Sequence, residues 1–354
     1  MKIKVKIYGA GSIGNHLAQA CRRNDWDVSV VDINAEALKR MKDEIYPKRY
    51  GVWDENIKLY EAGQELKGGF DVIMLGTPPD IRADLAFQIL EQECPRPRLI
   101  LLEKPLCSVK DINRFYEFKR NADIFGIIVL VGYNHALSRS IGDVVRLLKT
   151  QTTGKTEIID VEWREHWEGI FAAHPWLAGP KDSYLGYTAR GGGALGEHSH
   201  GIHLWLLLAK MSGFGEPKEI SAFLDFQNNG LDFDKIAAIN IRTNKGKQGR
   251  VIQDVITKPA KKWARIQGSK GFIEWECKSN KDSVYFDCAG RSARMDFPKT
   301  RADDFFAEIK HLEDLLTGKK FAESFISFDL GIKTMQIISA VQSSNRYSLI
   351  QPLI

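Results

Sequence analysis

Three glycines near the N-terminus, Gly9, Gly11 and Gly14, have the spacing of a phosphate-binding turn. They follow a strand-like run, Lys4–Tyr8, and open a segment with helical spacing. In that context the first glycine permits a tight turn, the second lets the backbone approach a pyrophosphate, and the third lets the helix pack closely on the strand. The start of such a helix also offers N–H donors to phosphate oxygens. The residues predicted to form this turn are Gly9, Gly11, Ser12, Ile13 and Gly14.

A carboxylate at the end of the next strand-like run narrows the choice of ligand. The run Val28–Val31 is followed by Asp32, 18 residues beyond Gly14. A carboxylate at this place can accept hydrogen bonds from both hydroxyls of an adenine ribose. It also repels a 2′-phosphate, and the next two residues, Ile33 and Asn34, supply no arginine to offset that repulsion. The sequence therefore predicts a dinucleotide site that takes NAD rather than NADP.

A lysine follows a third strand-like run. Leu99–Leu102 is continuously apolar, as expected of a parallel strand buried on both faces, and Glu103 and Lys104 come directly after it. Ligands of open α/β sheets bind beyond the carboxyl ends of the strands, so Lys104 is expected on the side of the cofactor. The preceding strand ends in the same manner at Thr77 and Pro78. A solvated lysine after a strand is the ordinary alternative for Lys104.

A glutamate and three histidines follow the triple glycine Gly191–Gly193, at the start of an apolar segment with helical spacing. On a continuous helix of about 100° per residue, Glu197 and His200 are about 60° apart and can face one pocket. His198 and His203 lie about 100° and 120° from Glu197, on opposite sides of it. All four side chains therefore cannot converge, although His203 can neighbour His200.

Two other interpretations apply to these histidines. The spacing of Glu197 and His200 recurs at Glu308 and His311, as in carboxylate di-iron bundles. Such bundles need four long helices with two further glutamates, whereas the chain between the two copies is rich in strands, so no metal site is predicted. Histidines satisfied by hydrogen bonds at a helix start are the structural alternative for His198 and His203.

The elements that must position these residues fall into two parts. Residues 1–125 alternate short β-branched runs with helical segments, which is typical of a parallel sheet with crossover helices. Residues 126–354 contain strand-like runs joined by short turns of Gly, Asn and Lys, and two helical patterns at Ala302–Leu316 and Asp329–Ser343. The predicted fold class is an α/β Rossmann domain followed by an α+β domain with a mostly antiparallel sheet.

Composition excludes several classes of protein. The 354 residues are 44% hydrophobic and 27% charged, as in an ordinary globular protein. The formal charge is only +5 with no block of like charges, which argues against nucleic acid as a partner, and no apolar run is long enough to cross a membrane. Five scattered cysteines, without a C-x-x-C pair, suggest reduced thiols and a cytoplasmic protein.

The motifs together resemble those of the Gfo/Idh/MocA family, named after glucose-fructose oxidoreductase and inositol dehydrogenase. The resemblance extends nearly end to end and rests on order and spacing. It is carried by Gly9-x-Gly11-x-x-Gly14, Asp32, Thr77-Pro78, Glu103-Lys104-Pro105, Gly132-Tyr133-Asn134, Gly191–Gly193 with the acid and histidine after it, and Phe328–Ile332. It implies a Rossmann domain, a second domain with a large open sheet, and hydride transfer between a nicotinamide and an alcohol or ketone of a sugar, polyol or activated sugar.

The chain departs from the commonest family pattern, D-x-G-x-H-x-x-D. The acid is Glu197, and position 201, where that pattern has the histidine, is glycine. A variant with D-x-S-H, found in surface-glycan and activated-sugar pathways, is similar to Glu197-His198-Ser199-His200, and His174-Pro175-Trp176 and Tyr184 also look like it. The resemblance then assigns the catalytic histidine to His200, with His203 in reserve.

The resemblance also implies the following roles. His200 would take the hydroxyl proton, Lys104 would hydrogen-bond the same oxygen, and Glu197 would orient the histidine. Thr77, Pro78, Glu103 and Lys104 would border the NAD site. The candidates for substrate binding are Tyr133, Asn134, Arg164, Trp176, Tyr184, Arg190 and His203. An open sheet face suggests a homodimer or homotetramer. A non-catalytic dinucleotide-binding regulator or scaffold is the alternative, which the presence of Lys104 and His200 disfavours.

Overall fold

The computed structural model describes residues 2–227, 230–319, 323–347 and 349–353. The chain forms two compact units. Unit 1 comprises Met1–Cys107, Asp111–Asn134 and Ala302–Phe328, and unit 2 comprises Ser108–Lys110, His135–Arg301 and Asp329–Ile354.

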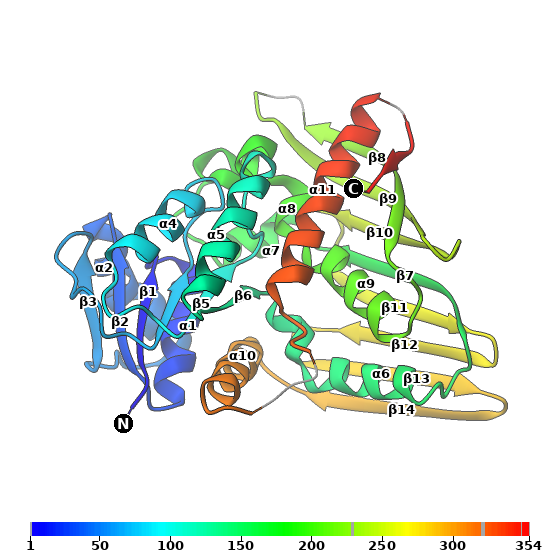
Figure 1. Cartoon of the computed structure of the whole chain (residues 1–354), viewed down its shortest axis with the longest axis horizontal. Coiled ribbons are helices and arrows are strands. Elements are labelled where there is room, and N and C mark those ends of the chain that lie inside the picture. The colour runs from blue at the N-terminus through cyan, green and yellow to red at the C-terminus, as the bar shows by residue number, and fades with distance from the viewer. Residues whose placement is uncertain (1, 228–229, 320–322, 348, 354) are drawn as a thin grey trace. The chain divides into compact units, whose positions relative to one another are not determined.

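Unit 1 is built on sheet A, whose six strands all pair in parallel in the order β3-β2-β1-β4-β5-β6 (Figure 1). This is the Rossmann order, so the predicted fold class is confirmed for this unit. Its strands are β1 (Lys4–Tyr8), β2 (Asp27–Asp32), β3 (Ile57–Glu61), β4 (Val72–Leu75), β5 (Leu99–Glu103) and β6 (Ile128–Gly132). Every residue of β4 and β5 is buried, as the continuously apolar run Leu99–Leu102 predicted for β5.

Helices cover both faces of sheet A. The right-handed crossovers of a parallel sheet place α1 and α2 on one face and α4 and α5 on the other. The helices of this part are α1 (Ser12–Arg23), α2 (Ala35–Arg40), the π-helix η1 (Met41–Ile45), α3 (Tyr46–Tyr50), α4 (Arg82–Gln92), the 3-10 helix η2 (Val109–Asp111) and α5 (Ile112–Ile124).

The helix α10 (Arg301–Leu316) packs on unit 1, although the sequence analysis placed it in the second domain. The ring of Phe305 stacks on that of His16 in α1, with centroids 4.6 Å apart. Asn24 donates a hydrogen bond to Glu313 at 2.9 Å, and Arg23 forms an ion pair with Asp303 at 2.7 Å. These contacts join segments almost 300 residues apart, which local patterns do not reveal.

Unit 2 is built on sheet B, with nine strands in the order β14-β13-β12-β11-β7-β10-β9-β8-β15. Only β7 and β10 pair in parallel among these described strands, so the predicted mostly antiparallel sheet is confirmed. The strands are β7 (Thr156–Arg164), β8 (Pro217–Gln227), β9 (Phe233–Thr243), β10 (Gln248–Asp254), β11 (Lys261–Gly268), β12 (Gly271–Cys277), β13 (Lys281–Cys288), β14 (Arg291–Pro298) and β15 (Gln351–Pro352).

Helices cover one face of sheet B, where α9 packs on β7 and β10, α6 packs on β12 and β13, and α11 hydrogen-bonds to β8 through Ser344 and Asn345. Strand β7 shows the consequence, because Ile159, Val161 and Trp163 point to the helices and are buried, whereas Ile158 and Asp160 point to the opposite face. The helices are η3 (Asn134–Leu137), α6 (Arg139–Lys149), α7 (Trp167–Ala172), η4 (Pro180–Asp182), η5 (Tyr184–Gly186), η6 (Thr188–Arg190), α8 (Gly193–Glu197), α9 (His200–Met211) and α11 (Phe328–Tyr347).

None of the helices in the described part of the chain is both long and apolar enough to span a lipid bilayer. None of the five cysteines forms a disulfide.

Candidate functional site

The glycine turn between β1 and α1 has the shape that a dinucleotide phosphate requires. Gly9 has a φ of +106°, which favours glycine, and a Cβ there would lie 3.2 Å from the backbone of Gly76. A Cβ on Gly14 would lie 1.8 Å from the carbonyl oxygen of Gly9, so only glycine lets α1 pack this closely. In contrast, no described protein atom lies within 4 Å of a Cβ built on Gly11, so the turn is open at that point. Gly9 and Gly14 therefore have the structural roles that the motif predicts, and the open side at Gly11 leaves room for the predicted pyrophosphate.

Asp32 lies beside this turn at the carboxyl end of β2. One carboxylate oxygen accepts a hydrogen bond from the N–H of Ala10 at 2.7 Å, and the other accepts from the N–H of Asn34 at 2.9 Å. A carboxylate has about four acceptor positions, so capacity remains for ribose hydroxyls. The side chain is thus fixed in orientation and fits the predicted contact with NAD.

Arg49 is a component of the turn that the sequence analysis missed. Its guanidinium donates to the carbonyl oxygen of Ser12 at 3.0 Å and to the hydroxyl of Ser12 at 2.8 Å. Ser12 is the first residue of α1, where the helix dipole already favours an anion. Arg49 adds positive charge at this helix start. It lies on α3, 37 residues after Ser12, and no local sequence pattern predicts the contact.

Lys104 follows β5 at the same carboxyl edge of sheet A. The buried carboxylate of Glu103 accepts a hydrogen bond from the N–H of Lys104 at 3.2 Å. A Cβ on Gly132 would lie 2.6 Å from that carboxylate, which explains the glycine at the end of β6. Tyr133 and Asn134 come next in the chain and are buried.

Arg82 is a second component that the sequence analysis missed, and it joins the loops after β4 and β5. Its guanidinium is buried, and it donates to the carbonyl oxygens of Thr77, Glu103, Pro105 and Leu106. The loop that contains Thr77 and Pro78 is therefore tied to the loop that contains Lys104. A buried arginine with four carbonyl partners sets the position of both loops.

In unit 2 the structure corrects one prediction about the histidines. Residues 197–203 are not a continuous helix, because α8 ends at Glu197 and α9 begins at His200. The angles predicted between Glu197 and His200 therefore do not apply. The relation between His200 and His203 does hold, since both lie on α9 and line one small cavity.

Asp234 holds the start of α8. Gly193 has a φ of +79°, and a Cβ there would lie 2.1 Å from a side-chain oxygen of Asp234. The other oxygen accepts a hydrogen bond from the N–H of Leu195 at 2.7 Å. This contact anchors the triple glycine to β9 and fixes where α8 begins, and the sequence analysis missed it.

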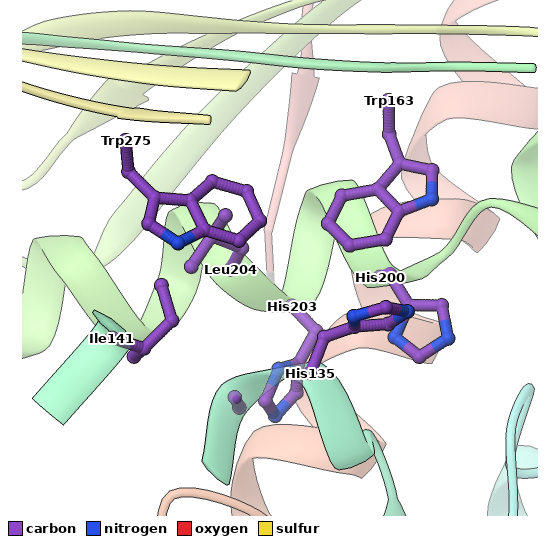
Figure 2. A pocket seen from close by; sticks show the side chains of 8 residues that line it. His135, Ile141, Trp163, His200, His203, Leu204 and Trp275 are labelled. Carbon is purple, nitrogen blue, oxygen red and sulfur yellow. The ribbon is translucent and has the colours of Figure 1, made fainter. Parts of the chain in front are cut away.

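His200 is held against β7 by aromatic rings (Figure 2). Its imidazole stacks on the indole of Trp163 with centroids 5.1 Å apart and planes 21° apart. The imidazole of His135 meets it edge to face at 4.9 Å. A Cβ built on Gly201 would lie only 3.0 Å from the Cβ of Trp163, so α9 approaches the strand too closely for a larger residue. Position 201 therefore has no room for a histidine side chain. The histidine stands at position 200 instead.

Further polar groups surround this end of α9. Tyr184 donates a hydrogen bond to Glu197 at 3.4 Å, which brings two predicted site residues together. Glu165 forms an ion pair with Lys262 at 2.8 Å. Burial raises the pKa of Glu165, but Lys262, His198 and Arg301 together outweigh burial, so the pKa lies below its usual value. Glu165, Lys262 and His135 were not predicted. Of these three, only His135 could have been found from the sequence, because it directly follows the Gly132-Tyr133-Asn134 motif.

Arg164, another predicted substrate-binding residue, is directed away from His200. Arg164 alternates with Trp163 along β7 and so points to the opposite face of sheet B, where it pairs with Asp254 at 2.5 Å. Trp176 stacks edge to face on His174, with centroids 5.3 Å apart. The guanidinium of Arg190 lies 5.9 Å from the ring centroid of Tyr187. Within the described ranges, no three His, Cys, Asp or Glu side chains are grouped as metal ligands.

Asp234 gives a prediction about stability and pH. Burial raises its pKa from 3.8 to about 8, despite hydrogen bonds from the N–H groups of Leu195 and Ala194. The carboxyl then keeps its proton in the folded state, whereas the unfolded chain ionises above about pH 4. The unfolded state binds fewer protons in this interval, so the free energy of unfolding should fall as pH rises from about 4 to 8, by up to about 1.4 kcal/mol per pH unit.

The measurement is the melting temperature between pH 6 and pH 9. Asp234→Asn, which imitates the protonated carboxyl, should lose much less stability over this interval than the unmodified chain. Asp287→Asn, at a half-exposed site on β13, is the control and should follow the unmodified chain. Parallel pH curves for Asp234→Asn and the unmodified chain would contradict the prediction.

No protein-family model matches the chain. It is 25% identical over 182 residues to a glycerol-3-phosphate dehydrogenase, NAD(P)+ type, of Acholeplasma laidlawii strain PG-8A; the match covers 49% of this chain and 51% of that protein. The chain thus spans about half the length of the curated relative that it matches.

Solved structures match the whole chain. They include an oxidoreductase from Agrobacterium radiobacter in complex with NAD+, L-tartaric acid and magnesium, with 17% identity, a TM-score of 0.76, and coverage of 100% of this chain and 99% of that one. A levoglucosan dehydrogenase in complex with NADH has 16% identity, a TM-score of 0.77 and full coverage of both chains. The aldose-aldose oxidoreductase of Caulobacter crescentus, complexed with glycerol, has 18% identity, a TM-score of 0.74 and full coverage of both chains.

The chain therefore has the fold of two-domain oxidoreductases, with a Rossmann unit and a unit built on a large, mostly antiparallel sheet. The resemblance to the Gfo/Idh/MocA oxidoreductases is confirmed at the level of the fold.

Proposed function

We propose that the protein is an NAD-dependent oxidoreductase that transfers hydride between the nicotinamide and a secondary alcohol or ketone of a sugar or polyol. The observation that carries the proposal is the glycine turn with Asp32 fixed beside it, because this pair fits both the pyrophosphate and the adenine ribose of NAD. Its fold is that of oxidoreductases solved with NAD+ or NADH. When bound, NAD would accept or supply the hydride.

The chain's own residues would manage the proton and the charge. His200 is the base that takes the proton of the reacting hydroxyl, and Lys104 hydrogen-bonds the same oxygen and stabilises the charge that develops on it. Glu197 balances the imidazolium that forms. This assignment is supported by the fixed orientation of His200 on Trp163 and by the position of Lys104 at the carboxyl end of β5.

Cofactor preference is the first test. The unmodified protein should bind NADH at least tenfold more tightly than NADPH, which corresponds to about 1.4 kcal/mol, because Asp32 accepts ribose hydroxyls and repels a 2′-phosphate. Titration of nicotinamide fluorescence measures both affinities. Asp32→Ser should remove most of the preference, whereas Asp27→Ser, an exposed change on the same strand, should keep it. Equal affinities in the unmodified protein would overturn the assignment of NAD.

The reaction is tested with a defined panel of alcohols. Reduction of NAD is followed with myo-inositol, levoglucosan, D-glucose and glycerol 3-phosphate, and then with nucleotide-activated sugars. Turnover of one of these at least about 100-fold above that of a Lys104→Ala variant supports the proposal. Binding of NADH without turnover of any sugar or polyol would instead favour a dinucleotide-binding regulator.

The finer assignments are also proposals. The open face of sheet B presents Phe223, which is 75% exposed, and a groove of about 510 Å³ that includes Ile158 and Ile350. These features support a homodimer or homotetramer formed through this face, which light scattering measures. The five cysteines without disulfides support a cytoplasmic location. The similarity to the D-x-S-H variant supports activated sugars of glycan biosynthesis as substrates.

A further inference from the structure

The imidazole of His200 is mostly buried. It can work as a base only if its orientation presents a ring nitrogen to the substrate. Its residue is only 7% exposed, and its ring contacts those of Trp163 and His135, which also contact each other with centroids 5.1 Å apart. Figure 2 shows these three rings at one side of a small cavity, with Trp275 at the other. The cavity has about 10 Å³, roughly the space of one water molecule, and so cannot hold a sugar. This small cavity is therefore not where a sugar binds.

Arg301 determines the protonation state and tautomer of His135. A guanidinium nitrogen of Arg301 lies 3.0 Å from Nε2 of His135. Arginine can only donate, so Nε2 must accept, and the imidazole is the neutral form with its proton on Nδ1. Burial lowers the pKa of His135 well below its usual value, and the positive charge of Arg301 lowers it further. His135 thus stays neutral at physiological pH.

The other charged groups around His135 also favour its neutral form. Lys262 on β11 and Lys299 before α10 also disfavour a charged His135, as does a charged His200 on α9. Each lysine has an acidic partner, Glu165 at 2.8 Å and Asp282 at 3.0 Å, respectively. His203, also on α9, lines the same cavity.

A neutral neighbour suits a base. When His200 takes a proton it becomes a cation, and a second cation with its ring centroid 4.9 Å away would oppose that step. A neutral ring opposes it much less and still restricts rotation of His200. Neither effect requires His135 to exchange a proton.

We propose that His135 is a positioning residue that holds the imidazole of His200 in its working orientation, and that Arg301 locks His135 in its neutral form. The inference rests on the proposed role of His200 as the base. The closing experiments therefore include measurements that do not depend on turnover.

The first experiment asks whether a neutral ring is sufficient. With the panel substrate of highest kcat/KM, His135→Ala should lower kcat about tenfold or more with KM changed less than about threefold, whereas His135→Phe should stay within about threefold of the unmodified enzyme. In a His200→Ala background, His135→Ala should cause no further loss. A Phe variant as slow as the Ala variant, or equal losses in both backgrounds, would overturn the positioning role. Normal turnover by His200→Ala would instead overturn the proposed function itself.

The second experiment tests the lock by nuclear magnetic resonance of the full chain labelled with ¹⁵N-histidine. In the unmodified protein, Nε2 of His135 should remain unprotonated from pH 8 to pH 5. In Arg301→Met the protonation midpoint of His135 should rise by about one pH unit or more, and the acid side of the kcat/KM profile should become steeper. Arg291→Met, at an exposed site on β14, is the matched control and should change neither. An unchanged midpoint in Arg301→Met, or a protonated Nε2 in the unmodified protein, would overturn the lock whether or not the enzyme turns over.

Discussion

Lys104→Ala and His200→Ala should each lower kcat by about 100-fold or more, which is the size of effect expected when a general base or a fixed charge donor is removed. The affinity for NADH should hardly change, because neither substitution alters the glycine turn or Asp32. His203→Ala should be mild, since His200 and not His203 is the residue stacked on Trp163. The measurements are steady-state kinetics with the best substrate of the panel and NADH fluorescence titration.

A structural loss must be separated from a chemical one. His200 packs against two rings, so removing its side chain can also cost stability. His200→Gln, which keeps most of the side-chain volume, is therefore made beside His200→Ala, and the melting temperature of each variant is measured. Both should be slow at temperatures where they are folded. A dead His203→Ala enzyme beside a normal His200→Ala enzyme would transfer the role of the base to His203.

Gly14→Ala and Gly11→Ala should fail in two different ways. A methyl group on Gly14 would lie 1.8 Å from the carbonyl oxygen of Gly9, so α1 must move away from β1. We expect a loss of about 3 kcal/mol or more in the free energy of unfolding, together with weak NADH binding. Denaturant unfolding and fluorescence titration measure the two quantities.

Gly11→Ala is the matched counterpart. No described protein atom lies within 4 Å of the added methyl group, and the φ of −75° is accessible to alanine. Its melting temperature should therefore stay within about 2 °C of the unmodified chain. NADH affinity should still fall about tenfold or more, because the methyl group occupies the side from which the pyrophosphate approaches. Unchanged NADH affinity in Gly11→Ala would show that the phosphates do not bind at this turn.

Much of unit 1 could be predicted because its signals are local. Gly9, Asp32 and Lys104 each follow directly on a strand-like run, and the carboxyl ends of parallel strands meet at one edge of the sheet. Sequence position then translates into spatial position without knowledge of any side-chain contact. The contributions of Arg49 and Arg82 could not be predicted this way, since each depends on carbonyl oxygens brought close by the turns of the backbone.

The environment of His200 was less accessible to sequence reasoning. A continuous helix was the natural extrapolation from the apolar spacing, but the structure has two helices, α8 ending at Glu197 and α9 beginning at His200. The side chain of Arg164 alternates with that of Trp163, and which of the two faces the helices depends on the packing of sheet B. The strand has isoleucines on both faces, at positions 158 and 159, so its hydrophobic pattern does not decide the question.

The sequence by itself thus determined the fold class, the glycine turn with Asp32, and the order of the chemical residues along the chain, because these depend on spacing within single strand-turn-helix units. The tertiary structure alone decided the partners of His200. His135, Trp163 and Gly201 come from three separate segments, η3, β7 and α9. Trp163 reaches His200 because α9 lies directly on β7, and His135 reaches it from η3. Such contacts depend on how closely two elements pack, and packing distance is set by both surfaces together.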